Sequence, residues 1–133
     1  MKKAFAPLLL AVAAFATISL VSGADYLGLA LPGGLPLGNA LTAIGLCAFA
    51  GAAFALSRRG TALRIASLTA LTAAVAWLPV SMWLAGNAAL NFPAARGDIW
   101  LAFSLAVVAC VFATLAWAGV ATLLALRMRR RAG

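Results

Sequence analysis

Four long apolar stretches dominate the chain, and short segments rich in polar residues, glycine or proline separate them. The stretches cover about residues 4–22, 39–56, 62–84 and 99–126, and Arg64 is the one charged residue within them. A helix that crosses the hydrocarbon core of a bilayer needs about 20 such residues. The pattern therefore predicts an all-α integral membrane protein, a bundle of four transmembrane helices built from two hairpins.

The first stretch has two interpretations. Lys2 and Lys3, the apolar middle and the small residues before Ala24 resemble a secretory signal peptide, whose cleavage would leave three spans. However, the apolar run is 18 residues long, whereas the apolar core of a signal peptide has about 7–15 residues. The longer run favours a retained first helix.

The composition supports a membrane protein. Hydrophobic residues make up 66% of the 133 residues and charged residues 9%, which is more apolar surface than one small soluble core could bury. Four spans and their connections use the whole length. We therefore treat residues 1–133 as a single transmembrane domain.

The charges predict the orientation in the membrane. The net charge is +8, and nine of the ten basic residues lie at span ends that alternate along the chain, whereas Asp25, Arg96 and Asp98 lie at the opposite ends. An excess of Lys and Arg marks the cytoplasmic side, so both termini and the loop at residues 57–60 are predicted to be cytoplasmic. The residues expected to set this topology and to contact lipid headgroups are Lys2, Lys3, Arg58, Arg59, Arg64, Arg127, Arg129, Arg130 and Arg131.

The placement of the charges also predicts where the protein is located and which partners it has. We take the alanine-rich chain to be bacterial, which predicts a multi-pass protein of the inner membrane. Nucleic acid is not an expected partner, because neither a basic groove nor base-stacking aromatic residues accompany the charges. The expected partners are the lipid bilayer and either other membrane subunits or further copies of this chain.

Small residues recur every four positions in the second and fourth stretches. Small side chains let membrane helices approach closely, where lipid removes the hydrophobic drive for association. Both stripes are therefore predicted to be packing faces. The predicted packing residues are Ala43, Cys47, Gly51 and Ala55 in the second stretch and Ala102, Ala106, Cys110, Thr114 and Ala118 in the fourth.

Several residues are expected to shape the helix ends. Asn39 and Asp98 are predicted to cap the second and fourth helices, with Arg96 close enough to pair with Asp98. Pro79 removes one backbone donor near the outer end of the third helix and is predicted to kink it. Residues 22–38, with two prolines around a glycine pair, are expected to lie in the headgroup layer; a re-entrant loop is the alternative.

The sequence excludes most catalytic chemistry. The chain has no histidine, two carboxylates and two cysteines, Cys47 and Cys110, both within apolar stretches. There is thus no histidine general base and no imidazole ligand for haem, the two carboxylates offer little for hydrolysis, and the two cysteines cannot assemble a zinc or iron–sulfur site within one chain. Intramembrane ionisable residues mark proton-coupled transport, and the middle parts of the spans have none. We therefore expect no enzyme activity and no cofactor.

Three functions remain. The first is a non-catalytic small subunit or assembly factor of a larger bacterial inner-membrane complex, held by its small-residue stripes. The second is a small homo-oligomeric transporter or channel for a neutral or weakly polar solute. The third is a protein that contacts lipid or pigment through Trp77 and Phe112. The polar residues that would line a transport path are Asn39, Thr42, Thr69, Thr72, Ser81 and Thr114.

Overall fold

The protein is all-helical, and four of its helices are long and apolar enough to cross a membrane. The computed structural model describes residues 2–133, with side chains from residue 4 onward. Within this range no strand is formed, and the only extended pairing is one isolated bridge between Ala30 and Pro36. Its helices are α1 (Lys2–Val21), a one-turn 3-10 helix η1 (Asp25–Gly28), α2 (Leu37–Leu56), α3 (Ala62–Ala85) and α4 (Arg96–Ala132). The chain is thus a multi-pass membrane protein.

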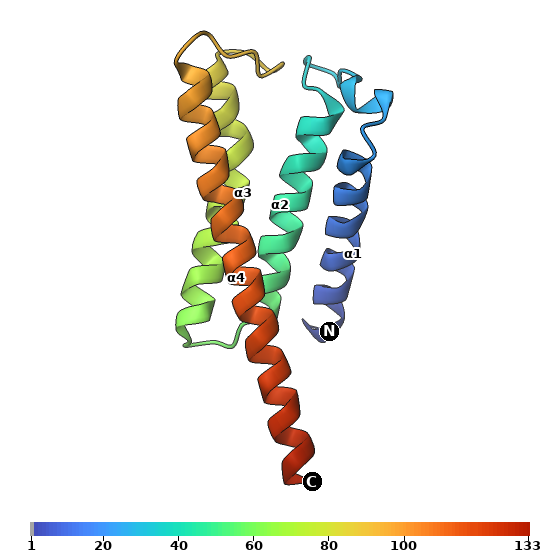
Figure 1. The fold of residues 1–133 in the computed structure, drawn as a ribbon, viewed down its shortest axis with the longest axis vertical. Coiled ribbons are helices and arrows are strands. Elements are labelled where there is room, and N and C mark those ends of the chain that lie inside the picture. The colour runs from blue at the N-terminus through green and yellow to red at the C-terminus, as the bar shows by residue number, and fades with distance from the viewer. Residues whose placement is uncertain (1) are drawn as a thin grey trace.

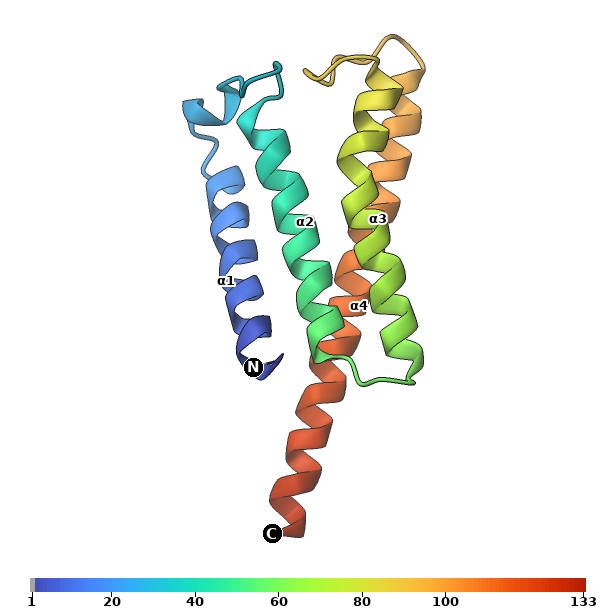
Figure 2. The same ribbon diagram turned by 180° about the vertical axis from the view of Figure 1, so that it is seen from behind.

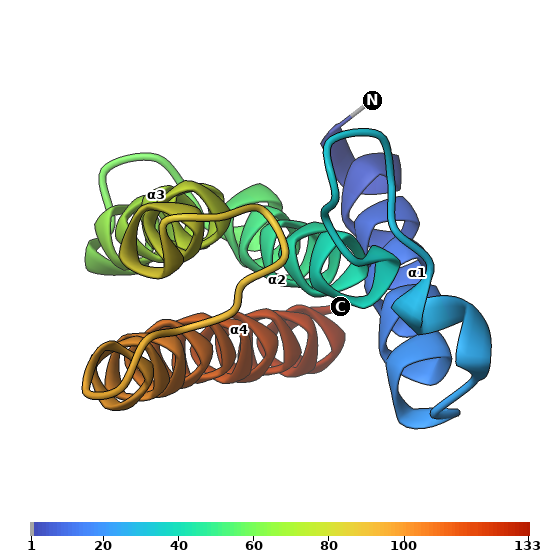
Figure 3. The ribbon, with the colours of Figure 1, turned by 90° about the horizontal axis from the view of Figure 1, so that it is seen from above.

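Helix α2 is the centre of the arrangement. It packs against α1, α3 and α4, and α3 and α4 also pack against each other. Seen from above, α1 lies on one side of α2, and α3 and α4 lie on the other (Figure 3). The molecule is therefore a three-helix group with α1 attached to one flank, rather than a bundle in which each helix has two equal neighbours.

The core of the three-helix group is built mainly from small and medium side chains. Residues from α2, α3 and α4 meet in one buried cluster, which contains Leu46, Ala50, Ala70, Ala74, Trp77, Val107 and Val111. A second cluster lies nearer the loop between α2 and α3, and it contains Ala53, Leu63 and Ala118. Alanine at so many contact positions lets the helix backbones approach closely.

The predicted caps of α2 and α4 are wrong. Helix α2 begins at Leu37, and its N-cap position is Pro36, so Asn39 lies inside the first turn. Proline supplies a fixed φ that suits a helix start, and the Leu37 amide is already held by the Leu29 carbonyl (2.8 Å). Helix α4 begins at Arg96, and no side chain caps it. Asp98 therefore stands in the first turn, where its charge still favours the positive end of the helix dipole.

Arg96 also differs from its predicted role. Its guanidinium donates to the carbonyl of Leu84 at the end of α3 (3.5 Å) instead of pairing with Asp98. The connection before it is folded by Asn87, whose amide group donates to the Asn91 carbonyl and accepts from the Asn91 amide (2.8 and 3.0 Å). The loop is thus tied to the end of α3.

The segment between α1 and α2 lies at the ends of these two helices and not between helices (Figure 1). The Leu31 amide donates to the Leu35 carbonyl and the Gly34 amide to the Leu31 carbonyl, both at 2.8 Å. This tight turn needs Gly33 and Gly34, whose φ angles are +99° and +90°. The re-entrant alternative therefore does not describe this fold.

Helix α4 is much longer than the other three. Its 37 residues correspond to about 55 Å, and its carboxyl-terminal part extends well beyond the ends of α1, α2 and α3 (Figures 1 and 2). The helix continues past Leu126 to Ala132, so the arginine cluster is helical.

Candidate functional site

Helices α1 and α2 approach each other closely at two glycines of α2. A Cβ atom added to Gly45 would lie 3.3 Å from the Ala16 Cβ atom, and one added to Gly51 would lie 3.2 Å from a methyl group of Leu9. Both distances are tighter than ordinary van der Waals contact, so glycine permits this approach. Gly51 therefore packs within the chain, against α1.

The alanines of α1 that complete this contact were missed by the sequence analysis. Ala6, Ala13 and Ala16 are buried, although most of α1 is exposed. They are spaced by seven and three residues, the periodicity of a helix seam. That spacing was available in the sequence, but it is hard to find in a stretch that is apolar on every face.

The two predicted stripes are not single faces of their helices. Four residues advance an α-helix by about 40° more than one full turn, so a stripe with this spacing winds around the helix. On α4, Ala102 and Ala106 are exposed, whereas Thr114 and Ala118 at the other end are buried. Cys110 is half-buried between them. On α2, Ala43, Cys47, Gly51 and Ala55 are all half-buried, because this helix has neighbours on three sides.

A different set of small residues forms a straight face on α4. Five exposed alanines alternate between four- and three-residue spacing, which keeps them within an arc of about 80° around the helix. The buried residues Val107, Val111, Thr114 and Ala118 lie on the opposite side. We call the exposed set the alanine face; it consists of Ala102, Ala106, Ala109, Ala113 and Ala116.

Two tryptophan–serine pairs join α3 to α4. The indole N–H of Trp77 donates to Ser104 Oγ, and that of Trp100 donates to Ser81 Oγ, both at 2.9 Å. Ser81 in turn donates to the Trp77 carbonyl (2.6 Å), and Phe92 stacks on Trp100 with ring centroids 4.8 Å apart. We call Trp77, Ser81, Trp100 and Ser104 the tryptophan–serine latch.

The latch changes the expected roles of its tryptophans. Trp77 is 3% exposed and belongs to the core, so it does not offer the lipid or pigment contact considered for it. Phe112 is exposed and stacks at a tilt on Phe49, with ring centroids 5.0 Å apart. Among the four tryptophans, Trp83 is the most exposed, at 79%, and it lies near the end of α3.

The loop at residues 57–60 is fastened to the end of α2 by Arg64. The Arg64 guanidinium donates to the Phe54 carbonyl (3.0 Å) and its carbon lies 3.4 Å above the centre of the Phe54 ring. Ser57 Oγ donates to the same carbonyl (2.7 Å), and Thr61 caps α3 by accepting from the Arg64 amide (3.2 Å). Arg64 thus closes the carboxyl end of α2.

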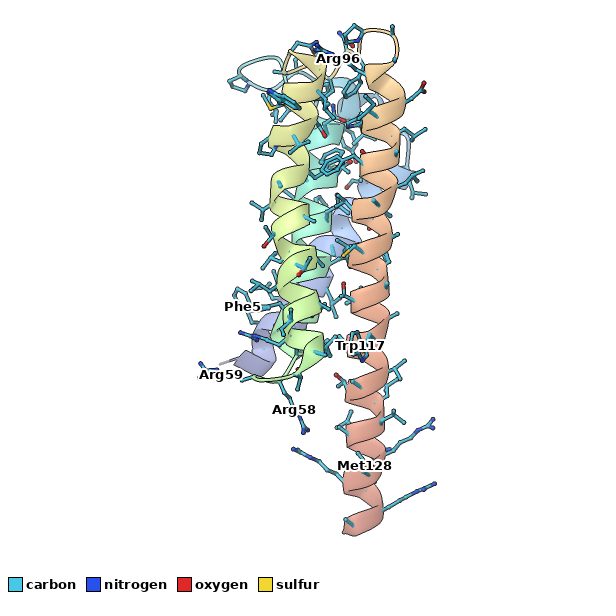
Figure 4. The ribbon with its side chains drawn as sticks, turned by 90° about the vertical axis from the view of Figure 1, so that its left-hand side faces the viewer. Phe5, Arg58, Arg59, Arg96, Trp117 and Met128 are labelled. Carbon is cyan, nitrogen blue, oxygen red and sulfur yellow. The ribbon has the colours of Figure 1, made fainter. Side chains whose placement is uncertain are left out.

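The other basic residues at this end project outward. Arg58 and Arg59 are exposed in the loop, and the arginine cluster lies further out along α4, around Met128 (Figure 4). Arg96 stands at the opposite end of the molecule (Figure 4). The side chains of Lys2 and Lys3, which were predicted to contact headgroups, lie outside the described residues.

The residues predicted to line a transport path differ in their surroundings within one copy of the chain. Five of the six residues are Ser or Thr, and their hydroxyl groups donate to carbonyls four residues earlier in their own helices. Thr69 and Thr72 are exposed, whereas Ser81 and Thr114 are buried between helices. Within one copy of the chain these groups therefore differ in exposure, and the path in a homo-oligomer stays a prediction.

An apolar groove opens between α1 and α3, with α2 as its floor. Its volume is about 510 Å³. We call it the lateral groove. It is lined by Leu9 and Val12 of α1, by Ala43, Ile44, Cys47 and Ala48 of α2, and by Ala74, Val75, Leu78 and Pro79 of α3. Pro79 lies inside α3, which continues through it to Ala85.

The residues that the structure describes contain no group of three or more His, Cys, Asp or Glu side chains placed to hold a metal ion. Cys47 and Cys110 are free thiols. Comparison of the chain with protein-family models, with curated proteins and with solved structures finds no match. The fold and these surfaces define a multi-pass helical membrane protein, and its function has to be argued from the surfaces themselves.

Proposed function

We propose that the chain is a non-catalytic small subunit or assembly factor of a larger complex in a bacterial inner membrane. The observation that carries this proposal is the alanine face of α4. It is exposed along its whole length, while the opposite side of the same helix packs against α2 and α3.

The geometry of the alanine face suits another transmembrane helix. Small side chains let a neighbouring backbone come close, and the resulting van der Waals contacts drive helix association in lipid. Alternating spacing of three and four residues matches the seam of a left-handed pair that crosses at about 20°. A lipid chain would gain fewer van der Waals contacts from the alanine face, because a lipid chain has no ridges of side chains that fit into this face.

The orientation we propose places both termini and the loop at residues 57–60 on the cytoplasmic side. The charges support it. Arg58, Arg59 and the arginine cluster of α4 lie toward one end (Figure 4). The connection that contains Asp25 and the start of α4, which contains Asp98, lie at the opposite end (Figure 1). Lys and Arg are enriched on the cytoplasmic side of membrane proteins.

The test is the size and content of the assembly in mild detergent. The variant Ala106→Leu/Ala109→Leu should migrate as a smaller particle than the wild-type chain on a native gel, because leucine blocks close approach. The control Ala11→Leu/Ala14→Leu places the same change on exposed positions of α1, and it should leave the size unchanged.

Mass spectrometry of the wild-type band separates this proposal from the alternative. A subunit or assembly factor requires at least one other chain in the band that the α4 variant loses. A band that contains only copies of this chain would overturn the proposal and support a homo-oligomer. Wild-type migration of the α4 variant would show that the alanine face is not the contact.

A further inference from the structure

The lateral groove lies well inside the candidate span of α3 and away from its ends. Pro79 and Val75 line it, and they stand six and ten residues before the end of α3 at Ala85. These separations correspond to about 9 and 15 Å along the helix. The hydrocarbon core is about 30 Å thick, so Val75 falls near its middle when the core ends close to Ala85.

Pro79 changes the polarity of one wall of this groove. Proline has no N–H, so the Val75 carbonyl lacks the donor that residue i+4 normally provides in an α-helix. Nearby hydroxyl groups do not replace it, because Thr72 donates to Leu68 and Ser81 donates to Trp77. The groove therefore has apolar walls, and one of them contains a backbone carbonyl, that of Val75, which lacks its usual hydrogen-bond donor.

A backbone carbonyl that lacks a hydrogen-bond donor, such as that of Val75, is unfavourable in hydrocarbon. Backbone groups freed by proline within a membrane are usually satisfied by a neighbouring helix, a Ser or Thr side chain, an ordered water molecule or a local change in helix geometry. Val75 and Pro79 are both exposed, and both line the groove. A hydroxyl group that enters the groove would supply the missing donor.

We propose that the lateral groove binds a long-chain alcohol, straight or isoprenoid. Its hydrocarbon body would lie against Leu9, Val12 and Leu78, and its hydroxyl group would donate to the Val75 carbonyl. The volume of about 510 Å³ falls within the range of about 300–1,000 Å³ that is typical of small-molecule sites. A phospholipid fits less well, because its polar groups remain at the interface and its acyl chains have no donor.

This inference is independent of the proposed subunit role, since it concerns a groove between α1 and α3 and not the alanine face of α4. The test uses the full-length protein in nanodiscs of phosphatidylethanolamine and phosphatidylglycerol. A diazirine analogue of hexadecanol is crosslinked by light, and the modified peptides are mapped by mass spectrometry. Labelling should concentrate on α1 near Leu9 and Val12 and on α3 near Val75 and Leu78.

Competition separates hydrogen bonding from simple hydrophobic filling. Unlabelled hexadecanol should compete roughly five-fold better than hexadecyl methyl ether, which has the same chain but no donor. The variant Pro79→Ala restores the N–H, so it should bring the two competitors to equal strength while α3 stays helical. Equal competition in the wild-type protein, or an undiminished preference in this variant, would overturn the proposal.

A matched pair of variants tests the place of binding. Val12→Trp fills the groove from its α1 wall and should reduce labelling several-fold. Ile18→Trp puts the same ring on an exposed position of α1 that does not line the groove, and it should leave labelling unchanged. Labelling spread evenly over the exposed residues of all four helices would show ordinary lipid contact and exclude a site.

Discussion

Single residues decide how close α1 comes to α2. At Gly45 the neighbouring atom is the methyl group of Ala16, which belongs to a buried alanine and cannot move aside without moving α1. At Gly51 the neighbour is the end of a Leu9 side chain, which is more adaptable. Gly45 is thus the more demanding of the two positions.

The variant Gly45→Leu should therefore destabilise the protein by about 1–3 kcal/mol, the usual cost of overpacking a close contact. The change is measured as a loss of thermal stability in detergent. Gly119→Leu is the matched control, because a Cβ atom at Gly119 would meet nothing within 4 Å. Equal losses in both variants would contradict the assignment of Gly45 to the helix contact.

The tryptophan–serine latch is also a residue-scale feature. Trp100→Phe keeps an aromatic ring against Phe92 but removes the N–H that donates to Ser81. We expect it to lower the stability by about 0.5–1.5 kcal/mol, since interhelical hydrogen bonds in membranes are modest.

The exposed Trp83 offers the control for the latch. Trp83→Phe should change the stability by less than Trp100→Phe, because the latch bonds come from Trp77 and Trp100. A double variant with Ser81→Ala should then add little to the loss caused by Trp100→Phe. Fully additive losses would show that the two residues act separately.

At the scale of the elements, Arg64 fastens the turn between α2 and α3. Arg64→Lys keeps the charge but loses the flat guanidinium that both stacks on Phe54 and donates to its carbonyl. The turn should loosen, and trypsin should cleave after Arg58 or Arg59 about two- to five-fold faster in the purified protein.

Arg127→Lys is the matched change for this experiment, because Arg127 lies on the extension of α4, away from the turn. The Arg127→Lys variant should be cleaved after Arg58 and Arg59 at the same rate as the wild type. If Arg64→Lys is cleaved no faster than this control, Arg64 does not hold the turn.

The four helices could be predicted from the sequence, but their contacts could not. Apolar length alone marks a span, because the bilayer sets it. In lipid, however, the packed and the exposed faces of a helix are both apolar, so polarity does not reveal which face meets a neighbour. Ala102 and Ala118 look equivalent in a four-residue repeat, yet they lie on nearly opposite sides of α4.

The candidate surfaces were predictable only in part. Gly51 was identified as a packing residue, but its neighbour Leu9 could not be inferred without the crossing of α1 and α2. The alanine face has a period of 3.5 residues, so the predicted four-residue stripe contains only Ala102 and Ala106 of it. The lateral groove depends on α1 and α3 standing apart on α2, a relation between distant segments that no local pattern encodes.

For the whole molecule, the central prediction concerns orientation. In inside-out vesicles, trypsin should cut the chain after Arg58 or Arg59 and remove the arginine cluster of α4. In right-side-out vesicles these sites should be protected, and the exposed Arg96 offers the one site expected on that side. The reverse pattern would contradict the proposed cytoplasmic location of both termini.

The central position of α2 has a consequence for the order in which the protein is assembled during synthesis. Helix α1 can complete its main packing as soon as α2 has entered the membrane, because α2 is its principal neighbour. The other faces of α2 are covered only after α3 and then α4 have entered the membrane. The α1–α2 pair would thus form first, and the emerging α3 and α4 would close on a helix already held in place.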